Sequence, residues 1–212
     1  MVRLSKVKIE WSPKFAYAIG LITTDGCLSR DGRHIDFTSK DKELVLKFRE
    51  CLGVANKIGI KFRGNDNYQK TKCFRIQLGD INFYEFLVSI GLKPAKSKTL
   101  SDLNVPDKYF GDFLRGCIDG DGSIGTFKHP ESIHPQLRIR LYSASPKFLG
   151  WIKNKISKNS DLKGGWIEEA GRCRVCKLVF AKDDSVKLLK LIYNNSICHL
   201  TRKYQIAEKF LI

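Results

Sequence analysis

Two aspartates end two similar apolar segments of this 212-residue chain. One segment covers residues 15–26 and places Asp25 before a glycine, and the other covers residues 110–122 and does the same with Asp121. If both segments are helices, each carboxylate adds to the negative C-terminal end of a helix, and two such ends side by side repel unless a cation joins them. Carboxylate and carbonyl oxygens are ligands of Mg²⁺, which also keeps water and bridges phosphate oxygens. The pair therefore predicts a divalent-metal site.

A stripe of small residues along each segment indicates how the aspartates would meet. Ala16, Gly20 and Thr24 form this stripe in the first segment, and Gly116 and Gly120 form it in the second. Small residues at this spacing allow two helix backbones to approach closely. We therefore expect a helix interface at Ala16, Gly20 and Gly116, with the carbonyls of Thr24 and Gly120 as further metal ligands. In the alternative reading, the acids merely end buried helices, with Gly26 and Gly122 as left-handed caps.

The pattern around these segments also repeats, which predicts an α+β fold. Each half reads as αββαββα: two pseudo-symmetric units, each with a four-stranded antiparallel sheet, joined at the two packed helices. The expected boundaries are residues 1–92 for the first half, 93–105 for a basic linker and 106–212 for the second half. A C-terminal helix near residues 200–211 has no expected counterpart, and we expect its charged face to be solvated.

The charge of the chain indicates a polyanionic partner. Lys and Arg number 38 against 22 Asp and Glu, a formal net charge of +16. Apolar and polar residues alternate along the strands, so one face of each sheet is expected to be polar; a merely solvated face is the alternative for any single side chain. The predicted contacts to double-stranded DNA are Arg33, His34, Asp36, Thr38, Lys61, Arg63, Arg75, Gln77, Arg138, Arg140, Tyr142 and Lys177.

Composition also bears on location and redox state. The sequence lacks a run of about 20 apolar residues and a signal-peptide core near Met1, so we expect no membrane partner and an intracellular protein. Seven scattered cysteines suggest reduced thiols in a reducing compartment, such as cytoplasm, nucleoid or an organelle matrix. Cys173, Cys176, Cys198 and His199 could hold zinc, but buried thiols are the simpler interpretation.

Residues 18–26 and 114–122 resemble the paired motifs of the LAGLIDADG homing endonucleases, in their single-chain form. The resemblance implies a monomeric, Mg²⁺-dependent enzyme, with Mn²⁺ or Ca²⁺ able to occupy the same site. It would break both strands of a long asymmetric DNA target and leave short 3′ overhangs. The chain departs from the family pattern at Ser39 and Ser143, where glutamine is frequent, and at Thr23, where the second copy has Asp119.

The resemblance further implies basic residues near the acids. Lys40 fits in the first half, where the second has Ala144, and Lys182 fits in the second, where the first has Asp80. This unevenness predicts that one strand is cut more slowly. Two other functions remain open: an RNA maturase that assists splicing of its host intron, and a DNA-binding regulator built on an inactive nuclease. Retention of both acids argues against the regulator.

Overall fold

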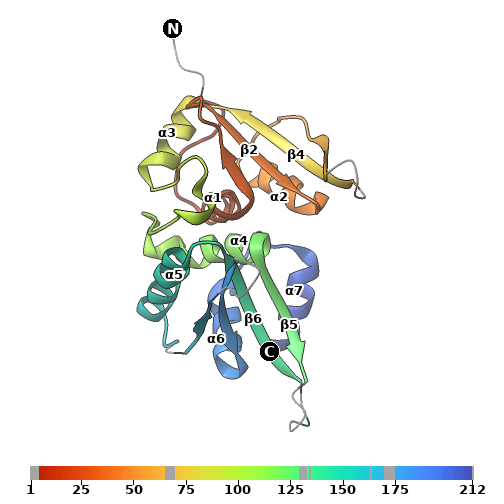
Figure 1. The fold of residues 1–212 in the computed structure, drawn as a ribbon. Coiled ribbons are helices and arrows are strands. Elements are labelled where there is room, and N and C mark those ends of the chain that lie inside the picture. Colours follow the sequence, from red (N-terminus) through yellow and green to blue (C-terminus); the bar gives the residue numbers. More distant parts are fainter. Residues whose placement is uncertain are drawn as a thin grey trace.

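The computed structural model describes residues 5–64, 70–128, 133, 135–162, 164–169 and 175–211. They form two halves stacked end to end, with one long helix of each half at the junction (Figure 1). The helices and strands of the first half are α1 (Pro13–Asp25), β1 (Gly26–Leu28), β2 (His34–Ser39), α2 (Lys42–Cys51), β3 (Gly59–Arg63), β4 (Thr71–Gly79) and α3 (Ile81–Ser89). Those of the second half are α4 (Phe110–Asp121), β5 (Gly122–Phe127), β6 (Gln136–Ser143), α5 (Pro146–Asn159), β7 (Trp166–Glu168), β8 (Cys176–Ala181), α6 (Lys182–Tyr193) and α7 (Thr201–Ala207). Short 3₁₀ turns occur at η1 (Lys96–Lys98), η2 (Asp107–Tyr109) and η3 (Glu208–Phe210).

The two sheets have the same topology. Their strand orders are β1-β2-β4-β3 and β5-β6-β8-β7, and every pairing is antiparallel. The first strand of each sheet begins directly after a motif helix, so Gly26 pairs with Phe37 and Gly122 pairs with Leu141. The predicted α+β fold with two αββαββα halves is confirmed.

Local sequence signals explain where several helices begin. Ser12 caps α1 by accepting a hydrogen bond from the Phe15 amide at 3.2 Å, with proline at the first helical position. Ser145 caps α5 in the same way, again followed by proline. Asp80, which is 2% exposed, caps α3 and also accepts the amide of Val7 at 3.0 Å. Its carboxylate therefore serves the structure of the first half.

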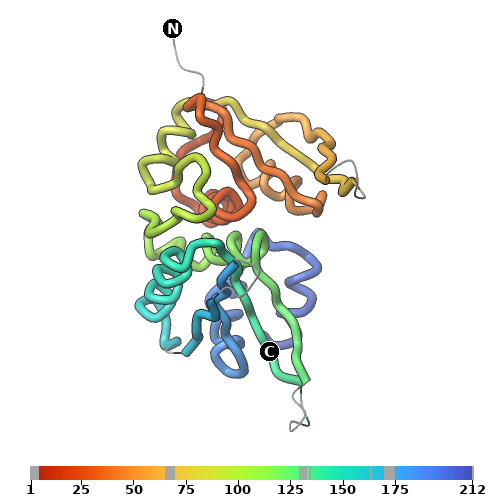
Figure 2. Tube along the Cα trace, in the orientation of Figure 1, coloured from red at the N-terminus to blue at the C-terminus, as the bar shows by residue number. Residues whose placement is uncertain are grey.

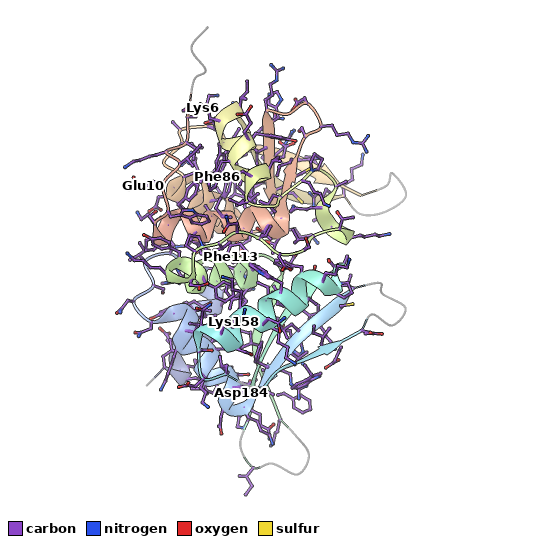
Figure 3. The ribbon with its side chains drawn as sticks, turned by 90° about the vertical axis from the view of Figure 1, so that its left-hand side faces the viewer. Lys6, Glu10, Phe86, Phe113, Lys158 and Asp184 are labelled. Atoms are coloured by element: carbon purple, nitrogen blue, oxygen red, sulfur yellow. The ribbon has the colours of Figure 1, made fainter. Side chains whose placement is uncertain are left out.

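The core runs without interruption from one half to the other. Phe15, Tyr17 and Ile22 of α1 are buried together with Phe113 and Ile118 of α4. Figure 3 places Phe113 at the level where the two halves meet. None of the helices that the structure describes is long and apolar enough to cross a membrane.

The edge strand β3 departs from the expected alternation. Alternation of apolar and polar residues predicts that Ile60 and Phe62 face the core, but they are 57% and 61% exposed. They pair with Phe74 and Lys72 of β4. Among the described residues, α2 packs on β4, whereas β3 lies at the edge of the sheet and is exposed along its whole length. The expected inward role of these two side chains is wrong, because edge position leaves that face open.

The segment between the halves is a packed part of the structure. Residues 90–106 run along one side of the molecule from the first half to the second (Figure 2). Leu92, Leu100 and Val105 are buried, and the Leu100 carbonyl accepts a hydrogen bond from Ser145 of the second half. The segment thus contributes to the core as well as connecting the halves.

Candidate functional site

Helices α1 and α4 touch backbone to backbone. A methyl group added at Gly20 would lie 2.1 Å from the Phe113 carbonyl oxygen, and one at Gly116 would lie 2.2 Å from the Tyr17 carbonyl oxygen. Only glycine fits at these two positions, because the obstructing atoms are backbone. Ala16 is fully buried, but the atoms of α1 nearest to Gly116 belong to Tyr17, Gly20 and Leu21.

This contact brings the two acids to one end of the helix pair. A methyl group at Gly120 would lie 2.1 Å from Thr24 Oγ1 and 3.2 Å from Asp25 Oδ2, so the Asp25 carboxylate lies beside the last turn of α4. Asp121 is the last residue of that turn. Both helices end in extended backbone, with φ of −80° at Gly26 and −105° at Gly122. The alternative of left-handed glycine caps is therefore wrong.

The surroundings of the acids favour their neutral forms. Removal from water, and then the charge of Asp121, raise the pKa of Asp25 to about 6, against the positive charges of Lys96, Arg63 and Lys203. Desolvation by surrounding protein also raises the pKa of Asp121, although the residue is exposed at the surface. Burial thus disfavours the ionised form of both carboxylates, and a divalent cation bound between them would favour that form.

A buried lysine lies beside each acid. Lys96 of η1 donates to the carbonyl of Gly26, and Lys203 of α7 donates to the carbonyl of Gly122 at 2.7 Å. These two glycines occupy the same motif position, so the lysines are related by the pseudo-symmetry of the halves. Lys203 also donates to Asp119 O at 2.9 Å and to Ile118 O. Each lysine thus places a positive charge at the negative end of a motif helix.

Burial weakens the charged form of both lysines. Desolvation lowers the pKa of Lys96, and it lowers the pKa of Lys203 to about 8; nearby carboxylates oppose both shifts. Backbone carbonyls accept hydrogens from both amino groups, which offsets part of the cost of burying their charged forms.

The segment that carries Lys203 is clamped to α4 by buried charged groups. Arg115 donates to Cys198 O at 2.5 Å and to the carbonyl of Ile192. Asp119 accepts the Leu200 amide and the Tyr17 hydroxyl, both at 2.8 Å. Burial raises the pKa of Asp119 to about 6, against Lys203 and these donors. We call residues 194–203 the C-terminal strap.

The donor set at the acids fits a hard divalent cation in part. Asp25 and Asp121 supply carboxylate oxygens, and the helix ends supply main-chain carbonyls such as those of Thr24 and Gly120. Among the described residues, no group of three or more His, Cys, Asp or Glu side chains could hold a metal. Water and phosphate oxygens would have to complete the coordination, which is how Mg²⁺ is commonly bound.

The outer face of the first sheet carries charged side chains. The register places Asp36 beside Gln77 and Thr38 beside Arg75 on one face, and Lys61 and Arg63 fall on that face too. Arg75 binds Asp36 Oδ1 through Nε at 2.9 Å and through Nη2 at 2.6 Å. His34 lies on the same face, whereas Arg33 lies in the turn before β2 and is exposed.

The outer face of the second sheet mixes cations with aromatic rings. Arg138, Arg140 and Tyr142 alternate along β6, with Lys177 opposite Tyr142. Arg138 stacks over Phe127 at 4.6 Å, and Lys177 pairs with Glu168 at 2.6 Å. The structure thus groups the predicted contacts of each half, apart from Arg33, on one face of its sheet.

The structure places Lys40 and Lys182, the two basic residues predicted near the acids, at different positions relative to them. Lys40 follows β2 at the end of the sheet where Gly26 pairs, and it is exposed. Lys182 follows Ala181, which pairs with Arg138, three residues and about 10 Å along β6 from the partner of Gly122. The structure does not bring Lys182 to the acids. The zinc alternative involves Cys173, which lies outside the described residues, and Cys176 and Cys198, which are buried.

Sequence reasoning missed the two buried lysines. Lys203 was expected on a solvated face and is 3% exposed, so that expectation is wrong. A signal was present: Leu200, Lys203 and Ala207 share one face of a helix, and the outer two are apolar. In the first half, Lys96 of the 3₁₀ turn η1 makes the corresponding contact with Gly26. Because each half holds one lysine, the predicted difference in strand rates loses the basis it had in sequence.

Comparison with known proteins agrees with this architecture. Residues 12–91 match the model of the LAGLIDADG-like domain family. A search of curated protein sequences gives no match. Solved structures with the same fold include the homing endonuclease I-WcaI bound to its DNA recognition sequence (TM-score 0.66, 13% identity, 98% of this chain and 88% of that chain). They also include I-DmoI in complex with DNA and Mn (0.55, 16%, 89% and 98%) and the N-terminal LAGLIDADG domain of DUF199/WhiA (0.54, 18%, 95% and 89%).

The fold and the site thus define a single chain of two half-domains that meet at paired motif helices. The match to the LAGLIDADG-like domain family covers residues 12–91, and residues 114–122 carry a second, similar motif in the other half.

Proposed function

We propose that this protein is a site-specific homing endonuclease that makes a double-strand break in a long asymmetric DNA target. The observation that carries the proposal is the pairing of Asp25 and Asp121 at abutting helix ends, each end capped by a buried lysine. Fold likeness to homing endonucleases bound to DNA supports it. A purely DNA-binding module has no use for two carboxylates whose ionised forms are disfavoured.

The two sheets supply the recognition surface. Cations on their outer faces would contact phosphates, and Arg138, Arg140 and Gln77 carry donor patterns that suit guanine or adenine in the major groove. The outer faces differ in sequence, so the two half-sites would differ too. Because both acids come from one chain, the active form is a monomer.

The chemistry is hydrolysis of a phosphodiester in each strand. Asp25 and Asp121, with the carbonyls of Thr24 and Gly120, would hold Mg²⁺. Mn²⁺ or Ca²⁺ could occupy the same site. The metal would polarise the phosphate and lower the pKa of bound water. Lys96 and Lys203 keep positive charge at the helix ends, which eases the approach of the phosphate. Cuts across the minor groove would leave short 3′ overhangs.

Selection from a library of long random duplexes tests this proposal. Incubation with Mg²⁺, capture of cut ends and sequencing should recover one asymmetric site with 3′ overhangs. Glu10→Gln serves as a control, because it removes an exposed carboxylate, paired with Lys8 before α1, and leaves the outer faces of the sheets and both acids in place. If no duplex is cut while the protein binds intron RNA selectively, the endonuclease proposal fails and the maturase alternative replaces it.

A further inference from the structure

Two cysteines from different halves meet in the interior. Cys51 is the last residue of α2 in the first half, and Cys198 lies in the C-terminal strap of the second. Their Sγ atoms are 2.9 Å apart, although 147 positions separate them in sequence. They are 8% and 4% exposed. A disulfide bond is about 2.05 Å long, so the sulfurs would need to approach by about 0.9 Å.

Further contacts hold the surrounding segments in this arrangement. Thr201 donates through its amide to Glu43 at 3.1 Å, and Arg202 Nε lies 3.2 Å from Asp41 Oδ2. On the other side of the strap, Arg115 fixes the Cys198 carbonyl at 2.5 Å. Helix α2 and its cap are therefore docked on the strap at two places besides the cysteine pair, and α4 holds the strap from its other side. Both cysteines therefore lie in segments that other contacts hold in place.

The pair is also polarised for reaction. The hydrogen bond with Cys51 lowers the pKa of the Cys198 thiol, against burial and the charge of Glu50, and the charges of Lys14 and Arg115 add to the lowering. The same hydrogen bond raises the pKa of Cys51. Cys198 is therefore the thiol that ionises first, and the thiolate is the form that attacks an oxidant.

We propose that Cys51 and Cys198 form a reversible disulfide that fastens α2 of the first half to the strap that carries Lys203. With hydrogen peroxide as oxidant, the Cys198 thiolate attacks one peroxide oxygen. The O–O bond breaks, leaving a sulfenic acid and a hydroxide that takes up a proton to become water. Cys51 sulfur then attacks the sulfenic sulfur, the S–O bond breaks, and a second water leaves. Two thiols lose two electrons and peroxide becomes two waters.

The Cys51–Cys198 disulfide would form whether or not the protein is a nuclease. The sequence-based expectation of a reducing compartment stays a prediction, and in such a compartment the pair would rest as thiols. Oxidant exposure would then lock the two halves at a second place, distant in sequence from the motif helices. Because the strap is already seated, closure should stabilise the fold seen here.

Peptide mapping of the full chain tests the proposal. The protein is treated with a small molar excess of hydrogen peroxide, blocked with iodoacetamide and digested without reduction. We expect a Cys51–Cys198 linked peptide that has lost two hydrogens and that dithiothreitol separates. Recovery of the two cysteines as separately alkylated peptides, or as sulfinic acids, would overturn the proposal.

Thermal unfolding with matched variants provides the second readout. Oxidation should raise the melting temperature by about 10 °C in the wild type and in Cys27→Ser, which removes an exposed thiol outside the pair. Cys51→Ala and Cys198→Ala should show no such rise. A linked peptide with a lowered melting temperature would contradict the claim that closure preserves the arrangement.

Discussion

The two halves hold their equivalent lysines, Lys96 and Lys203, in place by different means. In the second half, Arg115 and Asp119 project from the motif helix and bind the strap that carries Lys203. In the first half, the aligned residues are Ile19 and Thr23. Thr23 only returns its hydroxyl to the Ile19 carbonyl at 2.8 Å.

The first half relies on apolar packing and backbone geometry instead. Lys96 follows Ala95, whose φ of +54° turns the chain inward, and Leu92 and Leu100 are buried on either side. Both halves thus share one contact, from a buried lysine to the carbonyl of the glycine that follows the motif helix. The way in which the supporting segment is held can differ, because buried charged groups and apolar packing can each fix it.

The first prediction separates the two acids and carries the largest effect. Asp25→Asn and Asp121→Asn should each reduce cleavage of one strand by roughly 10³-fold or more, because each removes a carboxylate from the metal site. The product should be nicked DNA, with opposite strands nicked by the two variants. Strand-specific end labels on a plasmid or duplex carrying the recovered site would show this. Equal residual cutting of both strands by either variant would mean that the acids are not divided between strands.

The second prediction concerns the close backbone contact between α1 and α4, to which each half contributes one glycine. Gly20→Ala and Gly116→Ala should each destabilise the protein by at least about 3 kcal/mol, because the new methyl groups would meet backbone oxygens at 2.1 and 2.2 Å. Gly125→Ala is the matched control, since within the described part of the chain, its two sequence neighbours aside, no atom lies within 4 Å of the added methyl group. Urea unfolding measures the difference. Unchanged midpoints for the two interface variants would contradict the close helix approach.

The third prediction sharpens the difference in support. Asp119→Ala leaves the Leu200 amide and the Tyr17 hydroxyl without an acceptor and should cost about 2 kcal/mol in the free energy of unfolding. Thr23→Val at the aligned position should cost less than about 1 kcal/mol, because the hydroxyl serves only its own helix. Chemical denaturation compares the two. Equal costs would show that the second half does not depend on its polar clamp.

The fourth prediction uses pH and has the smallest effect. Because the pKa of Asp25 is raised to about 6 and metal binding needs the carboxylate, Mg²⁺ affinity should fall by about tenfold for each pH unit below 6. Without metal, the free energy of unfolding should instead increase as the pH falls. The folded-state pKa lies above the ordinary value of 3.8, so the folded chain gains stability as pH falls from about 6 toward 4.

Melting curves with and without Mg²⁺ from pH 5 to pH 7.5 measure both trends. Asp25→Asn should flatten the Asp25 contribution, whereas Asp121→Asn should retain a part of it. A metal effect independent of pH would argue against these carboxylates as the ligands.

The fold could be predicted because its signals are local and repeated. Ser12-Pro13 begins α1, and Asp31-Gly32 turns the first hairpin, where Gly32 has a φ of +75°. The site was only partly predictable. Gly20 and Gly116 pointed to the acids, but Tyr17 was missed, because its contribution is a backbone carbonyl and a hydroxyl aimed across the interface at Asp119.

The lysines were missed for a different reason. Sequence patterns rank lysine as a surface residue, and nothing in the composition of the segment around Lys96 shows that it turns back onto Gly26. The exposure of Ile60 and Phe62 escaped for a similar reason: strand order decides which strand is at the edge, and alternation does not report strand order.

The glycine contact between α1 and α4 also bears on how such a protein could be recombined. It joins backbone to backbone, so a half taken from another two-motif protein would fit here if it brought glycine at the position of Gly20 or Gly116. Other links between the halves need a particular pair of side chains, among them the hydrogen bond from Tyr17 to Asp119 and the contact of Cys51 with Cys198. A chimera would therefore keep its interface while losing these links, and restoring them as pairs would be the way to return its stability.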